Sequence, residues 1–133
     1  MKRKPELYLT LIDEIANHFV NAINNHYDIV TTPRPSKYRN PQNYAVYMIA
    51  DAVAKKTGLS HEIVFEQSKT KQYHGFHHPA SEEPIKIKKK ITGKSILLID
   101  DVYNSGETLK IHRQALVDMK NAVDCMVYLN YDS

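Results

Sequence analysis

Residues 95 to 110, SILLIDDVYNSGETLK, decide the fold. The apolar run from Ile96 to Ile99 has no polar alternation, which is typical of a central parallel strand covered on both faces. Asp100 and Asp101 stand at the carboxyl end of that strand, where open α/β sheets bind their ligands. Successive strand side chains point to opposite sides, so the two carboxylates can reach different hydroxyls of one sugar. The stretch therefore predicts a buried strand that ends in an acidic pair.

A turn of small and polar residues follows the acidic pair. It consists of Asn104, Ser105, Gly106, Glu107 and Thr108. A helix is expected from 108 to 120, so backbone N–H groups and hydroxyls would converge at its amino end, where a phosphate group is stabilised. The order of strand, acidic pair and turn predicts a site for a phosphorylated sugar.

The segment LLIDDVYNSGETL, residues 97 to 109, resembles the phosphoribosyl pyrophosphate (PRPP) signature of type I phosphoribosyltransferases in residue type, order and spacing. The resemblance implies that Asp100 and Asp101 are the catalytic pair that holds the ribose 2- and 3-hydroxyls. It also implies that the 104 to 108 loop holds the 5-phosphate. Asn104 departs from the family, in which many members have Asp or Thr, and an amide cannot accept a proton from the base. This departure affects base chemistry and leaves phosphate binding intact.

Other proteins also end an apolar strand in Asp-Asp, including Mg-dependent phosphatases, receiver domains and nucleotide-hydrolysing folds. None of them explains the Ser-Gly-Glu-Thr cradle. A phosphate-binding Gly-Lys-Ser sequence should follow a strand, whereas Gly93-Lys94-Ser95 precedes one, so an ordinary turn is expected there.

Helices and strands alternate along the rest of the chain. Helices are expected at 5 to 25, 42 to 57 and 108 to 120, and strands at 27 to 32, 63 to 66, 96 to 99 and 123 to 129. This alternation predicts one α/β domain over 1 to 133, a doubly wound, mainly parallel sheet of about four to five strands with flanking helices. The domain would include an N-terminal helix within 1 to 26 and a flexible loop at 67 to 92.

The first two helices are expected to be amphipathic. The first has Leu7, Leu11, Ile15, Phe19 and Ile23 at intervals of four, forming a face that packs on the sheet or at the subunit interface of a homodimer. The second turns Ala45, Ile49, Ala52 and Val53 inward, and Gly58 stops it.

A rigid basic turn, Pro33-Arg34-Pro35-Ser36-Lys37, follows the first strand. In a parallel sheet it opens on the same edge as the acidic pair, and type I phosphoribosyltransferases place a pyrophosphate loop at an equivalent point. The resemblance thus implies that Arg34, Ser36 and Lys37 bind pyrophosphate, and the alternative is a solvent-exposed proline turn.

The polar stretch from Gln67 to Thr92 contains several lysines and histidines. In the family a mobile loop near this place folds over PRPP, and Lys69 and Lys71 would meet the pyrophosphate. The alternative is a solvated β-hairpin or disordered loop whose charges only keep it soluble. A zinc site at His74, His77 and His78 would need further ligands that one cysteine does not supply.

Composition limits the partners. The 133 residues are 42% hydrophobic and 25% charged, with a formal charge of +3, which suits an anionic ligand. Nucleic acid is the weakest candidate, because the lysine run has no interleaved aromatic residues. No stretch is long and apolar enough for a membrane span. The single Cys125 lies in an apolar run, so a buried inert thiol and a reducing, cytoplasmic setting are expected.

The activity that the resemblance implies is transfer of ribose 5-phosphate from PRPP to a nitrogenous base with release of pyrophosphate. Mg²⁺ would bridge the sugar hydroxyls and the pyrophosphate near Asp100 and Asp101 without being held by the protein directly. No base pocket is recognisable, so a PRPP- or nucleotide-sensing regulatory module without catalysis is an alternative. A fainter resemblance over residues 28 to 129 is to ComF-type proteins, although the cysteine-rich zinc element of that family has no counterpart here.

Overall fold

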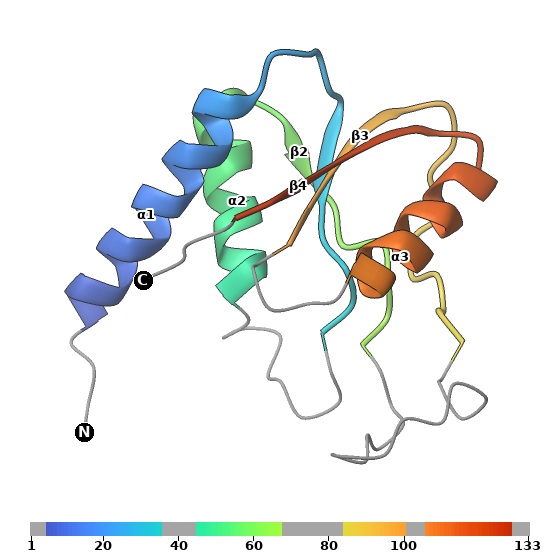
Figure 1. Ribbon diagram of the computed structural model, residues 1–133, viewed down its shortest axis with the longest axis horizontal. Coiled ribbons are helices and arrows are strands. Elements are labelled where there is room, and N and C mark those ends of the chain that lie inside the picture. Colours follow the sequence, from blue (N-terminus) through green and yellow to red (C-terminus); the bar gives the residue numbers. More distant parts are fainter. Residues whose placement is uncertain (1–4, 36–44, 68–83, 101–105, 129–133) are drawn as a thin grey trace.

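The sheet contains four parallel strands in the order β2-β1-β3-β4 within the part of the chain that the structure describes. The structure is a computed structural model, and it describes residues 5–35, 45–67, 84–100 and 106–128. The strands are β1 Ile29–Thr31, β2 Ser60–His61, β3 Ser95–Asp100 and β4 Ala122–Val127 (Figure 1). The predicted parallel α/β sheet is therefore confirmed.

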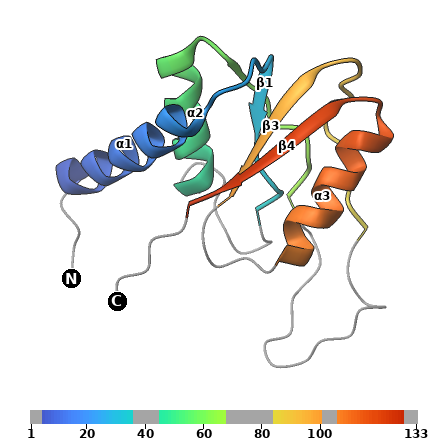
Figure 2. The same ribbon diagram turned by 45° about the horizontal axis from the view of Figure 1, so that its top comes forward.

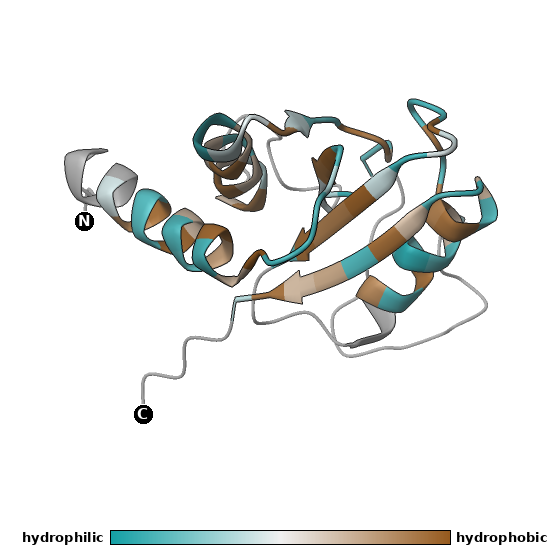
Figure 3. Ribbon diagram, turned by 90° about the horizontal axis from the view of Figure 1, so that it is seen from above, coloured by the Kyte–Doolittle hydropathy of each residue, from teal (hydrophilic) through white to brown (hydrophobic). Residues whose placement is uncertain are grey.

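Three helices in the described part of the chain cover the two faces of this sheet. They are α1 Pro5–Ala22, α2 Ala45–Thr57 and α3 Gly106–Asp118. Helices α1 and α2 lie together on one face and α3 lies on the other (Figure 2). The hydrophobic side of α2 is turned toward the strands (Figure 3).

The central strand β3 joins the two cores. Its side chains from Ile96 to Ile99 have no solvent exposure. Leu97 and Ile99 pack with α1 and α2, whereas Ile96 and Leu98 pack with Leu116 of α3. This alternation follows from the two-residue period of a strand, and it confirms that the uninterrupted apolar run marks a strand buried on both faces.

The sheet is doubly wound about the boundary between β1 and β3. The unit β1-α2-β2 extends the sheet to one side, and the unit β3-α3-β4 extends it to the other. The connecting helices cover opposite faces, so both crossovers have the same hand, as parallel crossovers require. The strand order reverses between β1 and β3, and in such folds that boundary is where ligands bind.

Two glycines act as the sequence indicates. Gly58 has φ of 82° and donates its N–H to the carbonyl of Ala54 at 2.8 Å, which ends α2. Gly93 has φ of 74° in the turn before β3, and its N–H donates to the carbonyl of Lys120. The Gly-Lys-Ser sequence is thus a turn that enters a strand.

The apolar face predicted for the first helix is partly wrong. Leu11 is 43% exposed, whereas Ile12, Ala16 and Phe19 are buried against α2 and the sheet. A spacing of four residues turns about 40° beyond a full helical turn, so a long series of fours leaves the buried face. The buried stripe instead alternates steps of four and three.

The strand predicted at 63 to 66 is wrong. The second strand is β2 at Ser60–His61, and Phe65 forms only an isolated antiparallel bridge with Ile87. Val64 and Phe65 are buried in the α3-side core, so their apolar character reflects burial and not membership of the parallel sheet. The N–H of Lys88 donates to the carbonyl of Val64 at 2.6 Å, so the end of the stretch predicted to be a flexible loop packs against this segment.

The prediction of a buried Cys125 is also wrong, because the residue is exposed. Of the six residues of β4, only Val123 is buried. Strand β4 pairs with β3 alone among the described strands, and an edge strand keeps part of its surface in solvent. The apolar run at 123 to 129 therefore indicated a strand correctly but overstated its burial.

Candidate functional site

The carboxyl ends of β1 and β3 lie side by side. The ladder pairs Thr31 of β1 with Leu98 of β3 in parallel, so the chain leaves both strands at the same edge of the sheet. Asp100 is the last residue of β3, and Arg34 comes three residues after the end of β1. The structure thus places the predicted basic turn and the first predicted carboxylate on one edge, at the boundary where the strand order reverses.

Asp100 is the only carboxylate among the buried residues that the structure describes, and it is 1% exposed. Its backbone carbonyl accepts the N–H of Tyr128 at 3.2 Å. A carboxylate is costly to bury and is found inside a protein where hydrogen bonds or positive charge stabilise it. Its place at the tip of the central strand suits a functional group better than a packing residue.

The end of β1 is held by threonine side chains. The Thr31 hydroxyl donates to the carbonyl of Glu62 at 2.7 Å, and the Thr32 hydroxyl donates to the carbonyl of Pro33 at 2.9 Å. Both threonines are buried, as are Pro33 and Pro35. The alternative of a solvent-exposed proline turn therefore does not describe this part of the turn.

Arg34 lies between these prolines and makes two hydrogen bonds across the site. Its backbone N–H donates to Nε2 of His112 at 3.2 Å. Its guanidinium Nη1 donates to the carbonyl of Pro84 at 3.0 Å. The arginine therefore connects the end of β1 to α3 and to the segment that precedes β3.

Sequence reasoning missed His112. The side chain is 1% exposed, and its ring meets the ring of Phe65 edge-on, with centroids 4.7 Å apart and an interplanar angle of 85°. The available signal was helical spacing, because His112 lies four residues before the fully buried Leu116. A histidine on the inward face of α3 thus contacts the turn predicted to bind pyrophosphate.

Several predicted site residues lie outside the described part of the chain. These are Asp101, Asn104, Ser105, Ser36, Lys37, Lys69 and Lys71, together with the histidines at 74, 77 and 78. Gly106, Glu107 and Thr108 form the first turn of α3, which begins two residues earlier than predicted. The predicted phosphate loop therefore leads directly into the amino end of a helix.

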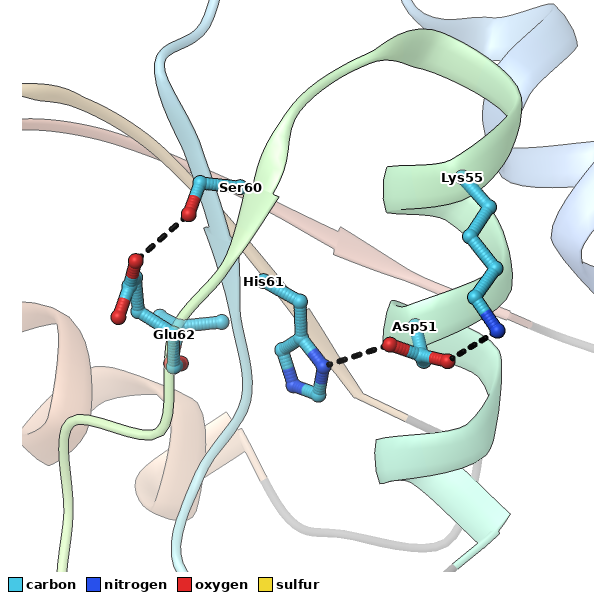
Figure 4. A network of polar contacts seen from close by, with 6 residues as sticks. Asp51, Lys55, Ser60, His61 and Glu62 are labelled. Atoms are coloured by element: carbon cyan, nitrogen blue, oxygen red, sulfur yellow. Dashed lines mark hydrogen bonds and ion pairs between the residues drawn. The ribbon is translucent and has the colours of Figure 1, made fainter.

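A second group of polar residues occupies the β2 edge of the sheet. In this β2-edge cluster, the carboxylate of Asp51 lies 3.1 Å from the Lys55 ammonium and 3.7 Å from Nδ1 of His61 (Figure 4). Glu62 accepts a hydrogen bond from Ser60 at 2.6 Å, and its other oxygen lies 2.5 Å from the Lys89 ammonium.

Burial and neighbouring side chains shift the pKa values of residues in and beside this cluster. Burial lowers the pKa of His61, and the nearby Asp51 carboxylate opposes that shift. Nε2 of His61 is buried without a hydrogen-bond partner. The edge of the His61 ring packs against Tyr47 of α2, whose pKa burial raises to about 12. The ammonium of Lys89, followed by the Ser60 hydroxyl, lowers the pKa of Glu62.

The described residues do not form a metal site of their own. No three His, Cys, Asp or Glu side chains converge within the described ranges. None of the helices described is long and apolar enough to cross a membrane.

Comparison with known proteins identifies the fold. No protein-family model matches the sequence, and neither does any curated protein. Adenine phosphoribosyltransferase from Saccharomyces cerevisiae matches in structure with a TM-score of 0.56 and 14% identity, over 96% of this chain and 71% of that one.

Two further solved structures match the fold of this chain. Hypoxanthine-guanine phosphoribosyltransferase from L. donovani has a TM-score of 0.54 at 11% identity, over 94% of this chain and 72% of that one. A hypoxanthine phosphoribosyltransferase from Staphylococcus aureus has a TM-score of 0.53 at 17% identity, over 96% of this chain and 65% of that one.

These matches define the class, a doubly wound α/β protein whose strand order reverses between β1 and β3. Within that class, the chain has the type I phosphoribosyltransferase fold. It spans 65 to 72% of the length of the three structures, and at 11 to 17% identity the likeness concerns the fold.

Proposed function

We propose that the chain binds PRPP at the carboxyl edge of β1 and β3 and transfers ribose 5-phosphate to a nitrogenous base, releasing pyrophosphate. One observation carries the proposal. The motif at 95 to 110 forms the central strand at the strand reversal of a phosphoribosyltransferase fold, with Asp100 at the tip and α3 beginning at Gly106.

Each part of PRPP would then have its own group of residues. Asp100 and Asp101 would hold the ribose hydroxyls, and the 104 to 108 loop would hold the 5-phosphate at the amino end of α3. Arg34, Ser36 and Lys37 would bind the pyrophosphate, with Lys69 and Lys71 approaching from the loop that follows residue 67. The phosphate groups would meet backbone donors and basic side chains, as the mild positive charge of the chain favours.

The chemical step exchanges one bond at the anomeric carbon for another. The bond from that carbon to the pyrophosphate oxygen breaks, the bond to the base nitrogen forms, and the proton of that nitrogen passes to water or to the released pyrophosphate. Positive charge develops on the ribose during this step, and the carboxylate of Asp100 at the strand tip would stabilise it. The protein would thus act through position and electrostatics, without a covalent intermediate.

Mg²⁺ fits this arrangement as an ion held mainly by the substrate. Magnesium prefers oxygen ligands and is commonly bound by one or two carboxylates together with substrate phosphates. The carboxylates of Asp100 and Asp101 would lie near the ion, and PRPP would supply its direct ligands. The ion would neutralise charge on the departing pyrophosphate.

Calorimetric titration with PRPP, with and without Mg²⁺, tests the proposal. We expect Mg²⁺-dependent binding in the micromolar range, and pyrophosphate release when one of a panel of purine and pyrimidine bases is added. The double variant Asp100→Asn with Asp101→Asn should lose both. Asp118→Asn is the matched control, because Asp118 is exposed at the far end of α3 and contacts Gln114.

These titrations test the proposed function and the proposed binding site separately. Wild-type protein that binds no PRPP under either condition would show that the proposed function is wrong. Normal binding and turnover by the double variant would show that the site is wrong.

A second candidate function retains PRPP binding without transfer. The observation that favours it is Asn104, an amide at a position where many family members have an acid that can accept a proton. In that case the chain would be a PRPP- or nucleotide-sensing module in the cytoplasm that regulates a partner or a second copy of itself. The same titration distinguishes the two, because a sensor binds PRPP and releases no pyrophosphate with any base.

A further inference from the structure

One hydrogen bond connects the two ends of the candidate site. Nε2 of His112 accepts the backbone N–H of Arg34 at 3.2 Å. Arg34 belongs to the turn after β1, and His112 belongs to α3, whose amino end follows the predicted phosphate loop. The bond therefore joins two segments that are far apart in the sequence and that would hold opposite ends of PRPP.

The prolines make this bond important for the turn. Proline has no backbone N–H, so Arg34 carries the only amide donor in the run Pro33-Arg34-Pro35. Both prolines are buried, and the ring fixes φ at each of them. A rigid, buried turn with one amide donor has little freedom to relax if that donor loses its acceptor.

The geometry also fixes the state of the histidine. A nitrogen that accepts a hydrogen bond must keep its lone pair, so this contact requires an unprotonated Nε2 on His112. The edge-on contact with Phe65 and an exposure of 1% hold the ring in this orientation. A buried leucine of similar size could fill the space but could not accept the N–H.

We propose that His112 is a positioning residue that fixes the Pro33-Arg34-Pro35 turn relative to α3 and thereby sets the affinity for the pyrophosphate end of PRPP. This inference rests on the proposed function for its ligand. The contact that carries it is between described residues and does not depend on a bound molecule.

The test compares two variants and two part-ligands. His112→Leu removes the acceptor, whereas His112→Gln offers Oε1 near the position of Nε2. Inorganic pyrophosphate with Mg²⁺ and ribose 5-phosphate are titrated separately into each protein, and circular dichroism confirms that each variant is folded. We expect His112→Leu to bind pyrophosphate about tenfold more weakly, since the partly buried Arg34 amide loses this acceptor. Ribose 5-phosphate should bind nearly as before, and His112→Gln should restore most of the pyrophosphate affinity.

Three results would overturn the proposal. Unchanged pyrophosphate affinity in His112→Leu would show that the bond does not position the turn. Equal weakening of both ligands would indicate a general structural role, and failure of His112→Gln to recover affinity would show that the acceptor is not what matters.

A measurement on the free protein separates this inference from the proposed function. Nitrogen-15 NMR of the wild type should show a protonated Nδ1 and an unprotonated Nε2 on His112, with the Arg34 amide protected from hydrogen exchange. If no ligand binds yet these signals are present, the positioning contact stands and the proposed function fails. A protonated Nε2 or an unprotected Arg34 amide would overturn the contact itself.

Discussion

Two histidines on opposite faces of the sheet are both largely buried, yet they are held differently. His112, on the α3 face, accepts a backbone N–H at Nε2. His61, on the α2 face, leaves its Nε2 without a partner, and its Nδ1 lies 3.7 Å from a carboxylate. The comparison shows that burial alone does not assign a histidine a role, because the partner of each nitrogen decides what its replacement would cost.

The largest expected effect on stability comes from the hydrophobic core on each face of the sheet. Leu116→Ala on the α3 face and Ile49→Ala on the α2 face remove buried side chains, and each should lower the free energy of unfolding by about 2 to 5 kcal/mol. Urea denaturation measures both losses. Only Leu116→Ala should also reduce the protection of the Arg34 amide, because Leu116 lies one turn from His112. Equal loss of that protection in both variants would show that the Arg34 amide does not depend specifically on α3.

Replacing each histidine by leucine should separate the two sites most clearly. His112→Leu removes the acceptor of the partly buried Arg34 N–H and should destabilise the protein by about 1 to 3 kcal/mol. His61→Leu removes a buried nitrogen that has no partner, so its effect should be close to zero or stabilising. Paired urea titrations at pH 7.5 measure the difference. A larger loss from His61→Leu than from His112→Leu would break the comparison.

The pH dependence of stability should reveal His61. Burial lowers its pKa in the folded protein, so the unfolded chain takes up a proton first as the pH falls below about 6.5. The contribution of His61 is therefore complete above that pH and decreases as the pH falls toward the folded-state pKa. Unfolding titrations between pH 7.5 and 5.5 should show a smaller fall in stability for His61→Leu than for the wild type. Parallel curves would mean that His61 does not carry this dependence.

The smallest effect on stability should come from breaking an exposed ion pair in the β2-edge cluster. Glu62→Gln removes the ion pair with Lys89, whose side chain is 55% exposed, and should cost less than about 1 kcal/mol. The difference from the wild type should shrink further in 1 M salt, because salt screens an exposed pair. A loss that is large and independent of salt would show that this pair belongs to the core of the fold.

Sequence reasoning succeeded where a pattern had one physical explanation. An uninterrupted apolar run that ends in two carboxylates fits a central parallel strand, and β3 has the predicted burial on both faces. Glycines with positive φ ended α2 and opened the turn before β3, as expected.

The wrong predictions concern strand pairing, burial and side-chain contacts, which depend on segments far away in the sequence. Phe65 is apolar and buried, as a residue of a central strand would be, but it does not belong to the parallel sheet. The strand that pairs with β1 is the short and more polar Ser60–His61. Cys125 lies in an apolar run, yet its exposure depends on β4 being an edge strand. His112 was missed because its partner is an amide 78 residues away, which no local pattern records.

The meeting of β1 and β3 has a consequence for how the protein forms. The units β1-α2-β2 and β3-α3-β4 each consist of segments that follow one another along the chain, whereas the ladder between them joins Ile29 to Ile96. Pairing over such a separation requires closure of a long loop, which makes it slow compared with local structure. The proposed site belongs to neither unit alone, so a chain with only one unit folded would contain its strands and helices but no place for the ligand. During synthesis, competence to bind would therefore appear in one step, when the two units dock.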